Sequence, residues 1–223
     1  MSQQNFRYPG VQPFQRSQAD RFFGRNDDRA RFLSLILQEK LCVLYGKSGY
    51  GKSSLLNAGI QPDLVKESAK GKRRYVAVPI RFLAAGGQGD DNLYEQFGFH
   101  LGQAMQAAGI SKATYAADLP HTLWGCFKSW QTDPGTVFIL LFDQFEELFS
   151  YKPEEQLAFR QQLAELLYSD YPQFLEENEP HLPPETVMHL AEKTNVHIVL
   201  AIRADRVSEL DRLRDHLSKI REK

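Results

Sequence analysis

The residues best suited to chemistry lie between positions 46 and 53, which read Gly-Lys-Ser-Gly-Tyr-Gly-Lys-Ser. This spacing fits the phosphate-binding loop pattern G-x-x-x-x-G-K-[ST], in which backbone N–H groups surround phosphate oxygens. The glycines let the backbone wrap closely, and the next helix directs its positive N-terminal end at the same anion. In this pattern Lys52 reaches the β- and γ-phosphates, and the Ser53 hydroxyl binds Mg²⁺. The loop therefore predicts a site for a phosphate chain and its metal ion.

The segments on either side of the loop are those that such a loop needs. An apolar run at 41–45 is typical of a buried strand, and 54–58 opens a helix. The alternative is a glycine-rich turn with a surface lysine, but the order of strand, loop and helix favours phosphate binding. The residues expected to contact a nucleotide from this segment are Gly46, Lys47, Ser48, Gly49, Tyr50, Gly51, Lys52, Ser53 and Ser54.

A second group of chemical residues follows the apolar run 137–142. Asp143 stands where a strand buried on both faces ends, so its carboxylate could bind Mg²⁺ directly or through water. Glu146 and Glu147 come one turn later and could orient or deprotonate an attacking water. The alternative is a helix start that is rich in acids because the helix dipole favours them. We predict metal ligands at Ser53 and Asp143, and the choice between the two glutamates stays open.

A third candidate, Arg203, ends the apolar run 196–202. A guanidinium at this strand end could reach a γ-phosphate and respond to its hydrolysis. The alternative is an ordinary surface arginine. The predicted catalytic set is therefore Glu146, Glu147 and Arg203.

Strands alternate with helices along the chain. Strand patterns occur at 41–45, 75–82, 137–142 and 196–202, and Pro79 indicates a sheet edge or an interrupted ladder. Helical patterns cover 27–38, 52–58, 92–108, 119–131, 153–168 and 205–222, whereas 84–91 is glycine-rich and 171–185 holds prolines and acids, so both are expected to be loops. This order predicts a three-layer α/β/α domain with a central, mainly parallel sheet.

Composition narrows the function classes. The chain has 223 residues, 42% of them hydrophobic, and a net charge of −1, which favours neither nucleic acid nor an anionic membrane as partner. A basic run at 70–74 is interpreted as a solvated loop. The two cysteines and six histidines show no metal-ligand spacing, and no disulfide framework is indicated. With no signal peptide and no run of about 18 apolar residues, we expect a cytoplasmic protein.

Four segments together resemble the bacterial STAND-class signal-transduction NTPases, relatives of the NACHT and NB-ARC switch ATPases in the AAA-like branch. The phosphate loop, continued as Ser-Leu-Leu-Asn-Ala-Gly to position 59, is generic. More specific are Asp143-Gln-Phe-Glu-Glu-Leu-Phe149, Ile202-Arg-Ala-Asp205, and Tyr8-Pro-Gly-Val-Gln-Pro-Phe14 with Phe22-Phe-Gly-Arg25. The similarity covers nearly the whole chain.

The resemblance implies ATP or ADP with Mg²⁺, and an arm at 1–26 that contributes to the pocket of a core at 27–223. Gly24 and Arg25 would lie near the adenine, and Arg203 would be the first sensor. Glu146 and Glu147 match the acidic pair of NACHT-type relatives. Gln144 departs from general AAA ATPases, which have a catalytic glutamate there, so the resemblance implies slow turnover. No guanine-reading Asn-Lys-x-Asp occurs, so ATP is preferred to GTP.

The resemblance also implies a longer protein, with downstream sensor and effector domains and self-association. Members of this family are expected to have a fifth strand beside the phosphate-loop strand, followed by a helical lid. We therefore expect this chain to be a nucleotide-binding core that stops before the fifth strand and the lid. The strand at 41–45 would then have a bare edge, which the arm or a partner could cover. The implied function is an ATP-dependent switch whose nucleotide state controls assembly and signalling. The alternatives are a nucleotide-binding scaffold with negligible hydrolysis and an AAA-type motor.

Overall fold

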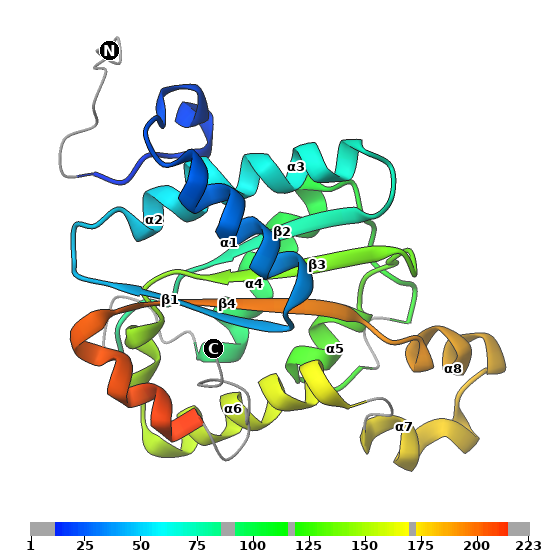
Figure 1. Ribbon diagram of the computed structural model, residues 1–223. Coiled ribbons are helices and arrows are strands. Elements are labelled where there is room, and N and C mark those ends of the chain that lie inside the picture. Colours follow the sequence, from blue (N-terminus) through cyan, green and yellow to red (C-terminus); the bar gives the residue numbers. More distant parts are fainter. Residues whose placement is uncertain (1–11, 86–91, 116–118, 170–172, 214–223) are drawn as a thin grey trace, which may run out of the picture.

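A four-stranded parallel sheet forms the centre of the protein. The computed structural model describes residues 12–85, 92–115, 119–169 and 173–213. The strand order is β1-β4-β3-β2, with every neighbouring pair parallel (Figure 1). The strands are β1 (Leu41–Gly46), β2 (Arg74–Ile80), β3 (Thr136–Phe142) and β4 (Asn195–Arg203). The predicted α/β fold with a parallel sheet is confirmed.

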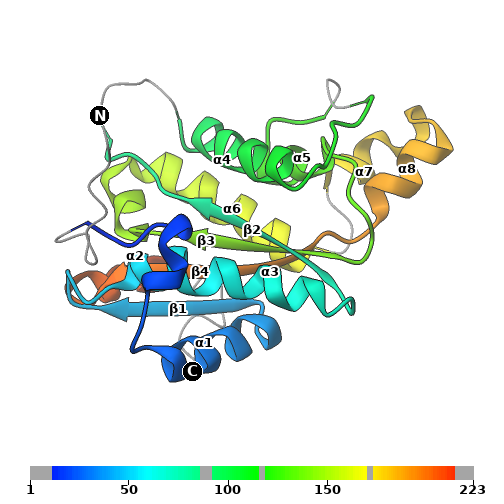
Figure 2. The same ribbon diagram turned by 90° about the horizontal axis from the view of Figure 1, so that it is seen from above.

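Helices cover both faces of this sheet. One face carries α1 (Asn26–Gln38), α2 (Lys52–Ser54) and α3 (Gln61–Ala69), and the other carries α4 (Leu93–Ala107), α5 (Leu123–Lys128) and α6 (Pro153–Tyr168) (Figures 1 and 2). Every residue of β3 is buried. Its side chains alternate between two cores: Val137, Ile139 and Leu141 pack on the α1–α3 side, and their neighbours pack on the α4–α6 side. The continuous apolar run at 137–142 follows from burial on both faces.

The helix after the phosphate loop is longer than predicted. It was expected to end near residue 58, but α2 continues through a π-helical turn, Leu55–Ile60, into α3. Gly59 and Pro62 look like helix breakers in the sequence. The wider π turn accommodates the proline just inside α3, and the small glycine leaves room for the Arg29 side chain beside it. Arg29 then forms an ion pair with Asp63 at 2.6 Å, which ties α1 to α3.

The loop prediction for 171–185 was wrong. The described part of this segment contains α7 (Gln173–Asn178), a 3₁₀ turn (Glu179–His181) and the start of α8 (Pro184–Ala191). Its prolines stand at helix starts, where the missing N–H costs nothing. Leu175 and Leu190 are buried against Trp124 of α5, and this small cluster holds the α7–α8 segment. Figure 1 shows both helices beyond the end of the sheet at which the strands begin.

Two other helix boundaries also differ from the prediction. The helix expected at 119–131 is reduced to α5, because Thr122 caps its start by accepting a hydrogen bond from Gly125 N at 3.1 Å. The segment expected at 205–222 is a 3₁₀ helix over Ala204–Leu213, and 214–222 lie outside the described residues. The remaining predictions for 27–38, 92–108 and 153–168 agree with α1, α4 and α6 to within one residue at each end.

The outer strands of the described sheet are β1 and β2. The edge position that Pro79 predicted for β2 is confirmed. Ser68 closes part of this edge, since its Oγ accepts a hydrogen bond from Tyr75 N at 2.9 Å. On the other side, β1 pairs with β4 and with no second strand among the described residues. β1 is therefore only partly buried, and Cys42 within it is half-buried.

No helix in the described parts of the chain is long and apolar enough to cross a lipid bilayer.

Candidate functional site

The phosphate loop leaves β1 at the carboxyl end of the sheet and turns back into α2. Gly49 and Gly51 have φ angles of +82° and +77°, a left-handed conformation that glycine adopts without a Cβ clash. The residues at the tip of the loop, 47–50, are exposed. In the register between β1 and β4, Gly46 lies beside Arg203. The parallel sheet therefore brings the loop and the predicted sensor arginine to the same end.

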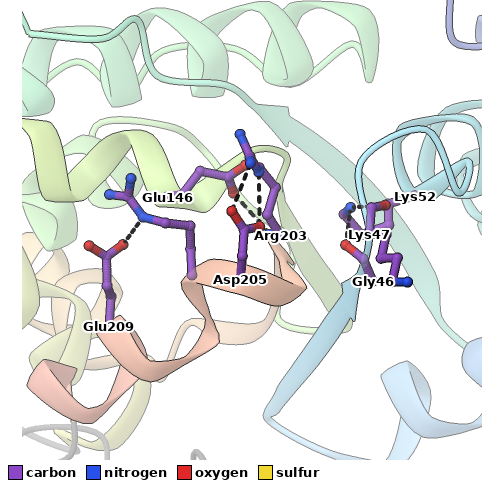
Figure 3. A network of polar contacts seen from close by, with 8 residues as sticks. Gly46, Lys47, Lys52, Glu146, Arg203, Asp205 and Glu209 are labelled. Carbon is purple, nitrogen blue, oxygen red and sulfur yellow. Dashed lines mark hydrogen bonds and ion pairs between the residues drawn. The ribbon is translucent and has the colours of Figure 1, made fainter.

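Lys52 lies against its own loop. Its Nζ donates hydrogen bonds to Gly46 O at 2.8 Å and to Lys47 O at 3.2 Å (Figure 3). The side chain is partly exposed, and both acceptors belong to the loop. An ammonium in this position can exchange these carbonyls for phosphate oxygens with a small movement of its flexible stem.

Ser53 and Asp143, which are 90 residues apart in the sequence, are in direct contact. The Ser53 hydroxyl donates a hydrogen bond to Asp143 Oδ1 at 2.9 Å. A hydroxyl and a carboxylate are hard oxygen donors, the kind that Mg²⁺ prefers. Within the described residues, no group of three or more His, Cys, Asp or Glu could hold a metal. The pair fits Mg²⁺ of the type that takes its remaining ligands from water and from substrate phosphates.

The N-terminal arm contacts the loop at two points. Phe14 N donates to Ser54 Oγ at 3.0 Å, and Arg25 Nη1 donates to Tyr50 O at 2.9 Å. Phe22 is buried in the core on the α1–α3 side and packs on the ring of Phe14, with 5.7 Å between ring centroids. A left-handed Gly24, with φ of +83°, then turns the chain into α1.

A hollow of about 310 Å³ opens beside the loop, between α1 and the carboxyl end of β1. Its walls come from α1, β1 and the loop and include Arg25, Phe32, Leu35, Tyr45 and Lys52. Apolar and aromatic walls with a few charged groups are typical of sites that bind small molecules. Arg25 joins this hollow to the arm, while Gly24 is not among its lining residues.

Glu146 and Arg203 meet at the same end of the sheet. Glu146 is 9% exposed, and its Oε2 accepts a hydrogen bond from the backbone N of Arg203 at 3.3 Å. The Arg203 guanidinium instead bonds Asp205 through two nitrogens, at 3.1 and 2.7 Å (Figure 3). These hydrogen bonds, which the Asp205 carboxylate accepts, raise the pKa of Arg203 above its ordinary value and lower the pKa of Asp205. The sequence pattern did not predict a role for Asp205, although this residue belongs to the Ile-Arg-Ala-Asp segment. An acid two residues after the arginine is the signal that could have predicted the ion pair.

The predicted site residues thus divide into groups. Ser53 and Asp143 lie together, Lys52 and Arg25 contact the loop, and Glu146 is joined to the backbone of Arg203. Glu147 lies on the 3₁₀ helix Phe145–Ser150, and its backbone oxygen accepts a hydrogen bond from Ser150 Oγ at 2.7 Å. Figure 3 shows the Glu146–Arg203–Asp205 group separate from the Lys52–Gly46–Lys47 group, with space between them.

Comparison with known proteins places this geometry in a family. No curated protein sequence matches the chain. Among solved structures, the Walker-type ATPase PABY2304 of Pyrococcus abyssi has a similar fold, with a TM-score of 0.53 and 16% sequence identity. The match covers 94% of this chain and 52% of that ATPase, so this chain spans about half its length. At this identity the likeness shows the α/β fold alone. The sequence matches the family "Novel STAND NTPase 1" over residues 8–223, and the chain therefore belongs to this family of STAND-class P-loop NTPases.

Proposed function

We propose that this domain binds ATP with Mg²⁺, hydrolyses it slowly, and uses its nucleotide state as a conformational switch in a signal-transduction protein. The observation that carries the proposal is the hydrogen bond between Ser53 and Asp143, which joins the phosphate loop to the strand β3. Membership of an NTPase family supports the reaction class.

The loop and Lys52 would bind the phosphate chain. Backbone N–H groups of 47–53 would surround the phosphates, with the start of α2 as a positive helix end. Lys52 would exchange its bonds to Gly46 O and Lys47 O for phosphate oxygens. Because those carbonyls are in a partly exposed loop, water can solvate them after the exchange.

Ser53 and Asp143 would hold the metal ion. When bound, Mg²⁺ would neutralise charge that develops on the β- and γ-phosphate oxygens. The Ser53 hydroxyl now donates to Asp143, and on metal binding its oxygen would face the cation. Asp143 would accept water or the cation through its carboxylate.

The arm would help to bind the base. We assign the hollow of about 310 Å³ beside the loop to the base and ribose, since it touches both Lys52 and Arg25. Arg25 would close this site from the arm side, and the Gly24 turn would set the position of Arg25. In this proposal residues 1–26 belong to the nucleotide pocket and 27–223 form the core.

Glu146, Glu147 and Arg203 would link hydrolysis to conformation. Arg203 would leave Asp205 to meet the γ-phosphate, and the exposed ion pair makes this exchange inexpensive. Glu146 accepts a hydrogen bond from the Arg203 backbone N–H, so a movement of either residue would displace the other. The presence of a γ-phosphate would thereby favour one conformation of the end of β4 and of the 3₁₀ helix that follows it. In a longer protein, such a bias could favour an assembled, signalling state.

A second function has one observation in its favour. Gln144 stands directly after Asp143, and an amide cannot take a proton from water as a carboxylate can. A scaffold that binds nucleotide with negligible hydrolysis would fit this residue. Single-turnover measurements with Mg²⁺-ATP separate the two: a slow burst of phosphate that Glu146→Gln or Glu147→Gln weakens supports the switch, and bound ATP that stays intact supports the scaffold.

The first test is calorimetric titration of ATP and ADP, with Mg²⁺, into the parent protein and Lys52→Ala. Lys66→Ala is the matched control, because Lys66 is an exposed lysine on α3 with a 3.2 Å ion pair to Asp63. We expect binding by the parent and the control and its loss in Lys52→Ala. Equal binding by all three proteins would show that nucleotide binds elsewhere, and no binding by the parent would overturn the proposal for this domain.

A further inference from the structure

Gln144 has the most unusual backbone at the site. Its φ is 55°, and it is the one non-glycine residue with positive φ among the residues that the structure describes. It lies in the turn between β3 and the 3₁₀ helix Phe145–Ser150, directly after Asp143. Left-handed backbone is unfavourable for a residue with a Cβ, and asparagine, aspartate and glycine occupy it more readily than glutamine.

The turn itself does not require a glutamine side chain. The turn is closed by the backbone, since Gln144 O accepts a hydrogen bond from Glu147 N at 3.0 Å. A glycine would adopt the same φ without strain and keep this bond. Strained residues collect at functional sites, where the side chain is needed in a particular direction. An unfavourable backbone of this kind, at a position where glycine would fit, is a reason to look for a role of the side chain.

The side-chain amide is also uncommitted. Gln144 is only partly exposed, yet its amide makes no hydrogen bond with any other residue that the structure describes. The nearby acids do have partners: Asp143 accepts a hydrogen bond from Ser53, and Glu146 accepts one from the backbone N–H of Arg203. Gln144 thus stands in sequence between the proposed metal ligand and the residue joined to the sensor, with both hydrogen-bonding ends of its amide available.

We propose that the Gln144 amide holds the attacking water beside the γ-phosphate, so that it is a catalytic residue which positions but does not deprotonate. This rests on the proposed function. The amide oxygen accepts a hydrogen bond from the water, and the amide NH₂ donates to a γ-phosphate oxygen. Water oxygen then bonds to γ-phosphorus, and the bond from phosphorus to the β–γ bridging oxygen breaks. ADP leaves with that electron pair, and the proton of the water passes to the departing inorganic phosphate.

This assignment separates the roles of the acids. Glu146 is buried and holds the backbone of Arg203, so it is a positioning residue for the end of β4. Since no carboxylate takes the proton in this step, turnover is slow. Gln144→Glu keeps the side-chain length and adds a base, so it should speed hydrolysis.

The test uses Gln144→Gly, Gln144→Asn and Gln144→Glu in the full chain. The glycine variant relieves the backbone, so its Tm should rise by about 2–4 °C. Its turnover should fall by roughly 100-fold with ADP affinity unchanged, because the loss is one of positioning. Asparagine is the matched control: it tolerates the left-handed backbone and keeps an amide that is one CH₂ too short, so it should lose turnover in the same way. The glutamate variant should turn over at least about tenfold faster than the parent.

A binding measurement checks the same point without turnover. The parent should bind ADP with aluminium fluoride, a mimic of the γ-phosphoryl group under attack, more tightly than ADP alone. Gln144→Gly should lose most of this preference. Unchanged turnover and an unchanged fluoride preference in Gln144→Gly would overturn the inference, as would a fall in its Tm. A parent that binds ADP with no fluoride preference overturns the inference and leaves the nucleotide site intact, whereas a parent that binds no nucleotide overturns the proposed function itself.

Discussion

Two lysines at opposite ends of the sheet make nearly the same hydrogen bonds. Lys52, at the carboxyl end, donates to the carbonyl oxygens of Gly46 and Lys47. Lys128 of α5, near the end at which the strands begin, donates to the carbonyl oxygens of His189 and Glu192 at the C-terminus of α8. Lys52 is partly exposed in a loop, whereas Lys128 is 4% exposed in a core.

The two lysines differ in the burial of their side chains and not in the kind of hydrogen bonds that they donate. A loop carbonyl that loses Lys52 can turn to water, so this bond is exchangeable. The ammonium of Lys128 is itself buried, so little water is at hand to replace these two carbonyls, although Glu192 is exposed and His189 is partly exposed. Burial also lowers the pKa of Lys128 to about 8. Lys52 can therefore exchange its partners, whereas Lys128 holds the C-terminus of α8 against α5.

Other polar groups at the two ends follow the same division. At the carboxyl end, the Arg203–Asp205 pair is about half exposed. At the opposite end, His197 is 6% exposed, its Nδ1 lies 2.6 Å from Ile36 O, and burial lowers its pKa. Near it, Lys40 donates to Asn195 Oδ1 at 2.6 Å. The charged side chains with exposed contacts, Lys52 and Arg203, are thus at the carboxyl end, whereas Lys128 and His197 at the opposite end are buried.

The largest expected effect is on stability. Lys128→Met keeps the side-chain volume but leaves the carbonyls of His189 and Glu192 without their donor, so the free energy of unfolding should fall by about 2–3 kcal/mol. Urea denaturation measures the loss, and hydrogen exchange should show α8 opening first. Lys66→Met is the exposed control. If the Lys128→Met protein is as stable as the parent, the hydrogen bonds of Lys128 do not stabilise the fold, and the proposed difference from Lys52 is wrong.

Lys52→Met should weaken nucleotide binding and leave stability nearly unchanged. We expect ATP affinity to fall about 10- to 100-fold, since a charged hydrogen bond contributes about 1.5–3 kcal/mol. The free energy of unfolding should change by less than about 0.5 kcal/mol, because the loop carbonyls become solvated. Calorimetry and urea denaturation on one sample report both numbers. A large loss of stability would mean that Lys52 is as structural as Lys128.

Ser53→Ala tests the metal site by itself. Removing one oxygen ligand should reduce the gain in ATP affinity that Mg²⁺ provides by roughly tenfold, while affinity measured in EDTA stays the same. Titrations with and without Mg²⁺ separate the two quantities. If Mg²⁺ strengthens binding equally in both proteins, the metal does not contact Ser53.

Lys128 should also make stability depend on pH. The pKa of its ammonium is about 8 in the folded protein and 10.5 in the unfolded chain, so between these values the unfolded state binds more protons. Stability should therefore rise with pH from about 8, by about 1 kcal/mol over the first pH unit. The measurement is the difference between parent and Lys128→Met in urea at pH 7.5 and 9. A difference that does not change with pH would contradict the lowered pKa.

Asp205→Asn should give the smallest change. Exposed ion pairs contribute about 0.2–1 kcal/mol, so stability should be nearly unchanged. With Arg203 released, the preference for ATP over ADP should rise by up to about fivefold. Competition titrations measure this ratio. If ADP gains as much as ATP, Arg203 does not meet the γ-phosphate.

The sequence predicted the fold where local pattern and tertiary environment agree. Each of the four strands was recognised to within about two residues, because burial of both faces produces continuous apolar runs. The α7–α8 segment was missed because its prolines mark helix starts as well as loops, and only the contact with Trp124 decides between them. The helix at 52–69 was cut short at Gly59 because a π turn has no local signature in one sequence.

The sequence by itself determined the phosphate loop, the strands and the types of residue that end them, since spacing and residue chemistry are local. Only the tertiary structure decided the contacts between them. The strand order places β4 between β1 and β3, so Arg203 lies next to the loop, and the turn after β3 brings Asp143 to Ser53. The burial of Lys128 and the left-handed backbone of Gln144 are likewise tertiary properties. Neighbours in a parallel sheet are set by packing of distant segments, which no local pattern encodes.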